Sequence, residues 1–158
     1  MISRGIYKIK DKFFDDFPDP YLKTNKDESR PCYFCFKEES TGLLWMIPMS
    51  KKIEKYKSII NKKQLQNKPC DILHVAKLGN DQESAFLIQD IFPITDEYIL
   101  NEYTINGVIL KITNDVLANI IERKAKTILM LIRKGVKLFN TQPDILKIEK
   151  TLLDKLKN

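Results

Sequence analysis

The fold is organised around the stretch from Trp45 to Lys57, which reads WMIPMSKKIEKYK. Its first half continues an apolar run, and the residues from Leu43 to Ile47 predict a buried strand. Pro48 has no backbone N–H to donate and is expected to end that strand. Ser50 then has the character of an N-cap, so Lys51 to Ile60 is expected to form a short helix. The stretch therefore predicts a hydroxyl where a strand passes into a helix.

The predicted start of this helix suits an anion. A helix N-terminus presents free N–H groups and the positive end of the helix dipole. Lys51 and Lys52 follow the Ser50 hydroxyl directly. Two interpretations are open at this point: a capped surface helix with a solvated basic face, or a turn that binds phosphate.

The distribution of charge bears on that choice. The chain carries 27 basic and 21 acidic side chains, a net charge of +6. Residues 51–68 hold seven lysines and one acid, Glu54, so this segment alone carries +6, and the remainder of the chain is neutral. A local positive patch is typical of a protein with a phosphate-rich partner, although a solvated lysine-rich helix gives the same count.

Composition indicates a single globular domain over residues 1–158. The chain is 43% apolar and 30% charged, and no apolar run approaches the roughly 18 residues of a membrane span. The N-terminus lacks the apolar core of a signal peptide, so we expect a cytoplasmic protein with no membrane partner.

The cysteines do not indicate a disulfide framework or a metal site. There are three, an odd number, and Cys32 and Cys35 lie in a run that predicts a strand. Residues three apart on a strand face opposite sides, and the chain has one histidine, His74. We expect neither a metal nor another cofactor.

Alternation, periodicity and turn signals predict the other elements. Pro18 and Pro20 break regular structure at the start of a polar loop, Asp19 to Pro31, and Asn106-Gly107 indicates a further turn. Tyr98 to Tyr103 fits either one helical turn or a short strand. Strands are expected at Gly5–Lys10, Cys32–Lys37, Cys70–Leu78 and Ser84–Phe92, a turn at 79–81, and helices from Val116 to about Phe139, capped by Asn114 or Asp115, and at Ile145–Leu156. Together these elements suggest a small twisted barrel with helices packed beside it, or else a split five-stranded sheet.

The types of side chain present restrict the reactions that the protein could catalyse. One histidine excludes a Ser-His-Asp or Cys-His set, and five scattered glycines form no phosphate loop. Lysine, serine and a helix start suit RNA cleavage, because RNA carries its own nucleophile, the 2′-hydroxyl. An enzyme then has to align that hydroxyl, stabilise the charge on the phosphorane and protonate the leaving 5′-oxygen. The expected products carry a 2′,3′-cyclic phosphate and a 5′-hydroxyl.

Several short motifs bring a resemblance to a known family. They are Gly5-Ile6-Tyr7, Arg30-Pro31, the segment Ile47–Lys52, the segment Phe86–Ile94 and the long basic helix. In order and spacing they resemble the endoribonuclease toxins of type III toxin–antitoxin systems, the ToxN/AbiQ family, most closely its CptN branch. The resemblance spans almost the whole chain.

The resemblance implies a fold and a biology. The fold would be α+β: a small SH3-like barrel of about five to six strands, as in the Kid and MazF toxins, with a long C-terminal helix and further helices packed beside it. The activity would be metal-independent RNA cleavage. The partners would be RNA substrates and a pseudoknot-type repeat RNA antitoxin, which the toxin processes and which inhibits it in a closed protein–RNA assembly with a role in phage resistance.

The resemblance also assigns catalytic residues. The family pairs hydroxyl residues with a lysine just after the proline, and Ser50 and Lys52 fit these positions. Lys51 stands where a second hydroxyl is usual, so either lysine can face the scissile phosphate. Phe13 stands where other branches carry a tyrosine, and its ring can stack on a base. Tyr7 is expected in or beside the core strand.

Further basic residues are candidates for RNA contacts. They lie in the polar loop, on the helix after Ser50 and on the long helix: Lys23, Lys26, Arg30, Lys55, Lys57, Arg123, Arg133 and Lys137. A non-catalytic RNA- or DNA-binding module remains the alternative, because the same positive patch would serve it.

Overall fold

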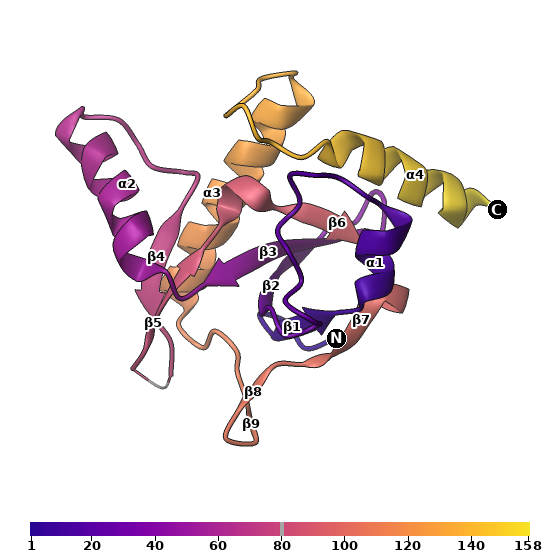
Figure 1. Ribbon diagram of the computed structural model, residues 1–158, viewed down its shortest axis with the longest axis horizontal. Coiled ribbons are helices and arrows are strands. Elements are labelled where there is room, and N and C mark those ends of the chain that lie inside the picture. The colour runs from indigo at the N-terminus through magenta and orange to yellow at the C-terminus, as the bar shows by residue number, and fades with distance from the viewer. Residues whose placement is uncertain (80) are drawn as a thin grey trace.

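The computed structural model describes residues 1–79 and 81–158, so the turn predicted at 79–81 lies partly outside the described residues. The strands are β1 (Ile6–Ile9), β2 (Cys32–Lys37), β3 (Leu44–Ser50), β4 (His74–Lys77), β5 (Glu83–Phe86), β6 (Phe92–Ile94), β7 (Ile99–Glu102), β8 (Thr104–Ile105) and β9 (Val108–Ile109). The helices are α1 (Asp11–Asp16), α2 (Ile53–Leu65), α3 (Asp115–Arg133) and α4 (Ile145–Lys157), with 3₁₀ turns η1 (Ile88–Asp90) and η2 (Asp96–Tyr98) (Figure 1).

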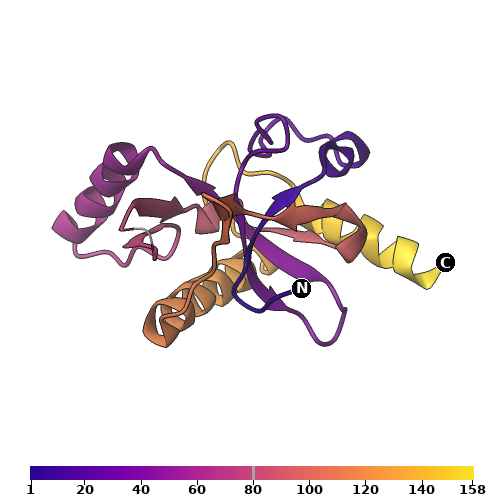
Figure 2. The same ribbon diagram turned by 90° about the horizontal axis from the view of Figure 1, so that it is seen from below.

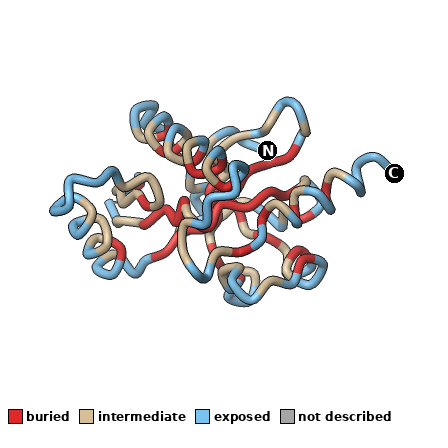
Figure 3. The backbone as a smooth tube through the Cα atoms, turned by 90° about the horizontal axis from the view of Figure 1, so that it is seen from above, coloured by how far each residue is buried: buried red, intermediate tan, exposed pale blue. Residues whose placement is uncertain are grey.

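Seven strands form one antiparallel sheet around β3. The order is β4-β5-β3-β2-β1-β7, and β6 pairs with the first half of β3. Every residue of β3 is buried. Figure 2 shows α3 on one side of the sheet and the segment with α1 on the other, and in Figure 3 the buried stretches run through the centre of the molecule. The expected α+β class is confirmed.

The strand pairing does not close a barrel among the described residues. β3 pairs with β6 over Leu44–Met46 and with β5 at Met49 and Ser50. β4 and β5 therefore leave the body of the sheet and form a lobe with α2 (Figure 1). This lobe has its own small core, built from Tyr56, Leu73, Ala85 and Leu87. The change of partner along β3 keeps the sheet open, so the expected small SH3-like barrel is not confirmed.

Pro48 does not end β3, which is a correction to the sequence prediction. The missing N–H of Pro48 would point away from β2, into the interval where β6 has ended and β5 has not begun. No strand partner needs a donor there. The Pro48 carbonyl still accepts a hydrogen bond from the Leu87 N–H at 2.9 Å. The strand therefore runs through the proline to Ser50.

The strands that follow α2 are shorter than predicted. The expected strand Cys70–Leu78 is reduced to β4. The expected strand Ser84–Phe92 is broken into β5, η1 and β6, because the chain must step from one end of β3 to the other. Pro93 lies inside β6, which pairs with β3 on one edge and so tolerates a residue without a donor.

Helices α2 and α3 also depart from their predicted limits. α2 begins at Ile53 and ends at Leu65, later than predicted at both ends, because Ser50 is still paired with Ala85 in the sheet. α3 ends at Arg133 rather than near Phe139. Gly135, at φ 84°, donates to the Ile132 carbonyl while the Val136 N–H donates to the Leu131 carbonyl, the pattern of a Schellman cap.

Other sequence predictions are confirmed. Asn114 caps α3 by accepting from the Leu117 N–H at 3.1 Å, and α4 begins at Ile145 as expected. Asn106 and Gly107, both at positive φ, turn β8 into β9. The alternatives at 98–103 resolve into a strand, β7, entered through η2. No described helix is long and apolar enough to cross a membrane.

The aromatic core explains a helix that the sequence did not predict. α1 buries Phe13 completely, against Phe17, Phe92 and Tyr98. The Phe13 ring is therefore not available to stack on a base, contrary to the sequence interpretation. Tyr7 is buried in β1, as expected, and its hydroxyl accepts from the Ile2 N–H at 2.5 Å.

Candidate functional site

The turn after β3 gives Lys51 and Lys52, which the sequence could not distinguish, different positions. The Ser50 hydroxyl accepts a hydrogen bond from the Lys52 backbone N–H at 3.2 Å and is buried. Lys52 has φ −76° and ψ 59°, and the Ile53 N–H donates to the Lys51 carbonyl at 2.8 Å. These are the features of an inverse γ-turn. Ser50 thus holds a tight turn, and is not the N-cap of α2.

The polar loop before β2 is fastened to the sheet by buried side chains. Arg30 donates from Nε to the Thr24 carbonyl at 2.7 Å and from Nη1 to the Met49 carbonyl at 2.9 Å. Asn25 donates to the Ile9 carbonyl at 2.8 Å. Arg30 is therefore engaged with the protein backbone, and the loop is tied to β1 and β3 on both sides of its tip.

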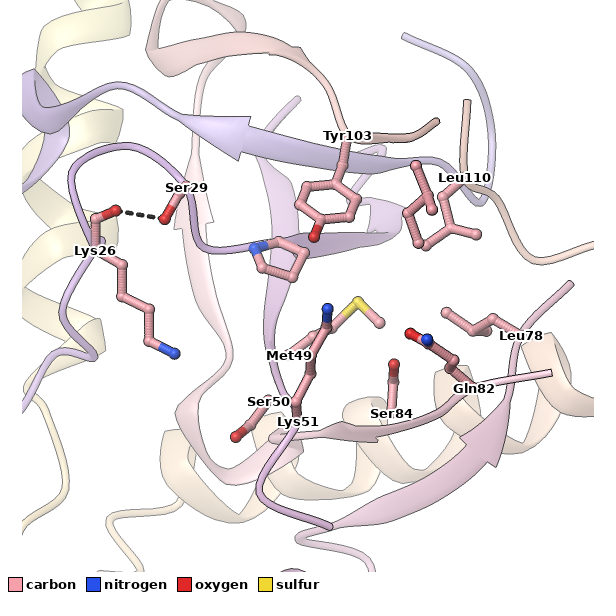
Figure 4. Close-up of a pocket in the computed structure, with 12 residues that line it drawn as sticks. Lys26, Ser29, Met49, Ser50, Lys51, Leu78, Gln82, Ser84, Tyr103 and Leu110 are labelled. Atoms are coloured by element: carbon pink, nitrogen blue, oxygen red, sulfur yellow. Dashed lines mark hydrogen bonds between the residues drawn. The ribbon is translucent and has the colours of Figure 1, made fainter. Parts of the chain in front are cut away.

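Lys26 lies at the tip of this loop. The residues from Lys26 to Glu28 have φ values of 50°, 53° and 61°, a left-handed run that non-glycine residues rarely adopt. The Ser29 hydroxyl donates to the Lys26 carbonyl at 2.5 Å and supports the turn. The loop so holds the Lys26 side chain over the end of β3 (Figure 4).

The surroundings of Lys26 lower the pKa of its ammonium group. The positive charge of Arg30 lowers the pKa of Lys26, and burial and the charges of Lys52 and Lys51 lower it further. A lower pKa makes the neutral amine available at a lower pH. Four cations from two separate segments are thus brought together by the fold, although the sequence analysis treated Lys26 and Arg30 as RNA contacts rather than as part of the catalytic turn.

These residues border a cavity of about 220 Å³. Lys26 and Ser29 come from the loop, Met49, Ser50 and Lys51 from the end of β3, and Ser84 from β5. Its remaining lining residues are Pro31, Leu78, Gln82, Tyr103, Ile105 and Leu110. In Figure 4 the Lys51 side chain points toward Tyr103, whereas the Ser50 hydroxyl points away from it. Lys52 is exposed and is not among the described lining residues.

Tyr103 and Ser84 were missed by the sequence analysis. Tyr103 precedes the β8–β9 hairpin and is held by its N–H, which donates to the Ile6 carbonyl at 2.7 Å. Ser84 is in β5 opposite Ala76. The turn signal at Asn106-Gly107 marked the hairpin, but no local pattern indicated that the hairpin folds back over the end of β3.

Two other candidates have partners within the protein. Lys23 lies 3.9 Å from the buried carboxylate of Asp90. Burial raises the pKa of Asp90 to about 6, although the nearby Lys23 and Arg30 oppose the rise. Lys55 places its ammonium 5.4 Å from the centroid of the Tyr56 ring.

A second groove, of about 610 Å³, lies between α2, β4 and α3. Lys57 pairs there with Glu83 at 2.9 Å, and Arg123 lies 3.5 Å from Asp71. Lys124 contacts Nδ1 of His74 at 3.1 Å, and burial together with Lys124 lowers the pKa of His74 to about 4. The imidazole is therefore neutral near pH 7 and accepts from the lysine. Arg123 and Lys57 are thus separate from the first cavity.

Arg133 is engaged in structural contacts. Its guanidinium donates to both carboxylate oxygens of Glu38, at 2.8 and 3.1 Å, and to Glu149, and it lies 5.5 Å from the centroid of the buried Trp45 ring. Lys137, beyond the end of α3, is exposed. Neither residue lines the cavity at Lys51.

Arg133→Ala is accordingly expected to lower stability more than RNA affinity. Losing the two-pronged pair with Glu38 should lower the free energy of unfolding by about 1 kcal/mol. Urea unfolding, compared with RNA affinity at one salt concentration, measures both effects. Lys137→Ala is the control, and a loss of affinity without a loss of stability in Arg133→Ala would assign Arg133 to the RNA surface instead.

The cysteines are not arranged as a metal site. Cys32 is buried in β2, and burial raises the pKa of its thiol to about 12. Cys35 is half-buried further along the same strand. Among the described residues, no three or more His, Cys, Asp or Glu side chains gather closely enough to hold a metal ion.

Comparison with known proteins gives matches in structure and none in sequence. No family model and no curated protein matches the chain. One similar structure is AbiQ, a lactococcal anti-phage endoribonuclease belonging to the type III toxin–antitoxin system, with a TM-score of 0.73, 11% identity, and coverage of 99% of this chain and 100% of AbiQ.

A second similar structure comes from work on bacterial type III toxin–antitoxin systems that describes selective toxin inhibition by a non-coding RNA pseudoknot. Its TM-score is 0.57 at 10% identity, with 99% of this chain and 100% of that chain covered. At such identities the matches show a shared fold. They confirm the fold resemblance that the short motifs suggested, and the CptN branch stays a prediction.

Proposed function

We propose that this chain is the toxin of a type III toxin–antitoxin system and an endoribonuclease. The observation that carries the proposal is the pair Lys26 and Lys51 lining one cavity, with the charge of Lys52 nearby, on a fold shared with an anti-phage endoribonuclease. Four close cations including Arg30 fit a phosphodiester, and a lysine with a lowered pKa fits proton transfer.

The proposed reaction uses the RNA 2′-hydroxyl as the nucleophile. The neutral Lys26 amine removes the 2′-hydroxyl proton, the 2′-oxygen forms a bond to phosphorus, and the bond from phosphorus to the 5′-oxygen breaks. The Lys51 ammonium stabilises the charge on the phosphorane and gives a proton to the leaving 5′-oxygen. The products are a 2′,3′-cyclic phosphate and a 5′-hydroxyl.

Ser50 and Lys52 have supporting parts in this proposal. Ser50 fixes the turn through the Lys52 N–H and so sets the direction of the Lys51 side chain. Lys52 is one of the charges that lower the pKa of Lys26. This assignment gives Lys51 the place at the phosphate that the sequence analysis preferred for Lys52, and it makes Ser50 a positioning residue.

The partner that we propose is a structured RNA antitoxin in a closed protein–RNA assembly. Inhibition by an RNA pseudoknot is described for the second similar structure. In this chain, exposed lysines of α2 and the basic groove with Arg123 and Lys124 extend the positive surface beyond the cavity. An RNA that covers both surfaces would block access to Lys51.

The cleavage chemistry is tested by removing the nucleophile or divalent metals. A substrate with 2′-deoxyribose at the scissile nucleotide is expected to resist cleavage, because the attacking oxygen is absent. Cleavage of the all-ribose substrate should persist in EDTA, since lysines supply the positive charge in the proposed reaction. Gel analysis of end-labelled RNA measures both, and restoration by magnesium of an activity lost in EDTA would refute the mechanism.

A further inference from the structure

The interior of the cavity is largely apolar, and the proposed reaction makes no use of these apolar walls. Behind the cationic rim its walls are apolar, formed by Pro31, Met49, Leu78, Ile105 and Leu110. Tyr103 adds an aromatic ring to these walls (Figure 4). The walls come from the loop, from β3, from the end of β4 and from the base of the hairpin, so the tertiary fold assembles them.

Several wall residues are fixed by burial or by backbone hydrogen bonds. Met49 and Leu78 are buried, with 2% and 7% of their surfaces exposed. Tyr103 is held on both sides, because its N–H donates to Ile6 and its carbonyl accepts from the Leu110 N–H at 3.0 Å. A concave, largely apolar cavity with a few polar groups is typical of small-molecule sites.

The Ser84 hydroxyl is among the polar groups that line this cavity. In Figure 4 the Ser84 hydroxyl points from β5 toward the space below Tyr103 and Leu110. Within the described part of the chain this hydroxyl has no hydrogen-bond partner, and a hydroxyl both donates and accepts. It can therefore contact the polar edge of a ligand whose faces lie against the walls.

A nucleobase has this combination of properties. Proteins that bind single-stranded RNA stack unpaired bases on aromatic side chains and contact base edges with polar groups. The cationic rim at Lys26 and Lys51 would hold the phosphate attached to the same nucleotide. An apolar peptide would not need this rim, and a free phosphate would not need the walls.

We propose that this cavity binds the base of the nucleotide that adjoins the scissile phosphate, with Tyr103 stacking on the base and Ser84 contacting its edge. The inference rests on the proposed function for its substrate, and it names the residues that set the sequence preference of cleavage. Tyr103 supplies affinity for any base, and Ser84 discriminates among bases.

The test uses Met49 as a reporter in the full-length protein labelled with ¹³C at its methionine methyl groups. The probes are the four nucleoside 3′-monophosphates and, as a probe without a base, ribose 5-phosphate. A stacked base should shift the Met49 methyl resonance, whereas Met130, 48% exposed on α3, should not move. Ribose 5-phosphate should leave Met49 unchanged, and equal shifts with and without a base would overturn the inference.

Variants then test the two assigned residues. Tyr103→Ala should weaken nucleotide binding about tenfold, whereas Tyr103→Phe retains the ring and should bind as the wild type does. Ser84→Ala should reduce the preference among bases about three- to tenfold, both in nucleotide binding and at the ends of cleaved RNA. The buried Met46 methyl reports on the fold of each variant.

The outcomes separate the inference from the function on which it rests. If RNA is cleaved but no nucleotide moves Met49, or Ser84→Ala keeps the wild-type preference, the base site is wrong and the endoribonuclease proposal stands. If nucleotides bind as expected but RNA is not cleaved, the cavity is a base site of a protein that is not a nuclease.

Discussion

Lys51→Ala is expected to lower the rate of RNA cleavage about a hundredfold or more, comparable to removing one donor that stabilises a charged transition state. The reason is geometric: the Lys51 side chain lines the cavity and belongs to its cationic rim, where the phosphorane would form. Lys52 lies outside the described lining and affects the site through its charge. Lys52→Ala should therefore lower the rate only severalfold. Single-turnover cleavage of one short RNA measures both variants.

Two controls make the comparison decisive. Lys62→Ala removes one exposed lysine of α2, away from the cavity, and should cleave at the wild-type rate. Lys51→Ala should still bind RNA, because most basic residues lie elsewhere. The reverse order, with Lys52→Ala inactive and Lys51→Ala active, would restore the assignment that the sequence favoured. A fall in RNA affinity that follows charge alone, with no cleavage by any variant, would favour the non-catalytic binding module.

Sequence patterns predicted an element correctly where residues close to it in the sequence determine its structure. The Asn114 cap, the Asn106-Gly107 turn and the run of β2 all depend on neighbouring residues, and all three are confirmed. Pro48 and Phe13 were misread because their outcome depends on distant parts of the chain. Pro48 is tolerated by a gap between β6 and β5, and Phe13 is buried by Phe92 and Tyr98.

For the same reason, the sequence indicated only part of the candidate site. Ser50, Lys51 and Lys52 are consecutive, so the sequence could find them as one turn. Lys26 reaches that turn through a left-handed loop that Arg30 ties to Met49, and Tyr103 reaches it through pairing next to β1. Contacts of this kind have no periodic signal in the sequence. The sequence therefore indicated which chemistry was available, and the fold indicated which side chains meet.

Substitution of Lys26 is the second change expected to lower the rate of RNA cleavage strongly. Lys26→Met removes the amine that would accept the 2′-hydroxyl proton, and general-base catalysis contributes roughly 10²- to 10⁴-fold, so cleavage should fall by at least about a hundredfold. Arginine is not expected to rescue activity, because a guanidinium does not lose its proton near neutral pH. Cleavage by Lys26→Met and Lys26→Arg, measured under single-turnover conditions against the wild type, tests this assignment.

The pH dependence of cleavage tests the same residue without removing it. A general base acts in its neutral form, so the wild-type rate should rise with pH until it passes the lowered pKa of Lys26 and then level off. Lys52→Ala removes a nearby positive charge and should raise the Lys26 pKa toward its ordinary value. The rising part of the profile should then move to higher pH, and Lys52→Ala should approach the wild-type rate in alkaline buffer. Lys51→Ala should stay slow at every pH, because its lost charge is not recovered by deprotonating Lys26, and Lys62→Ala should follow the wild-type curve. An unchanged profile in Lys52→Ala, or an active Lys26→Met, would mean that another group takes the proton.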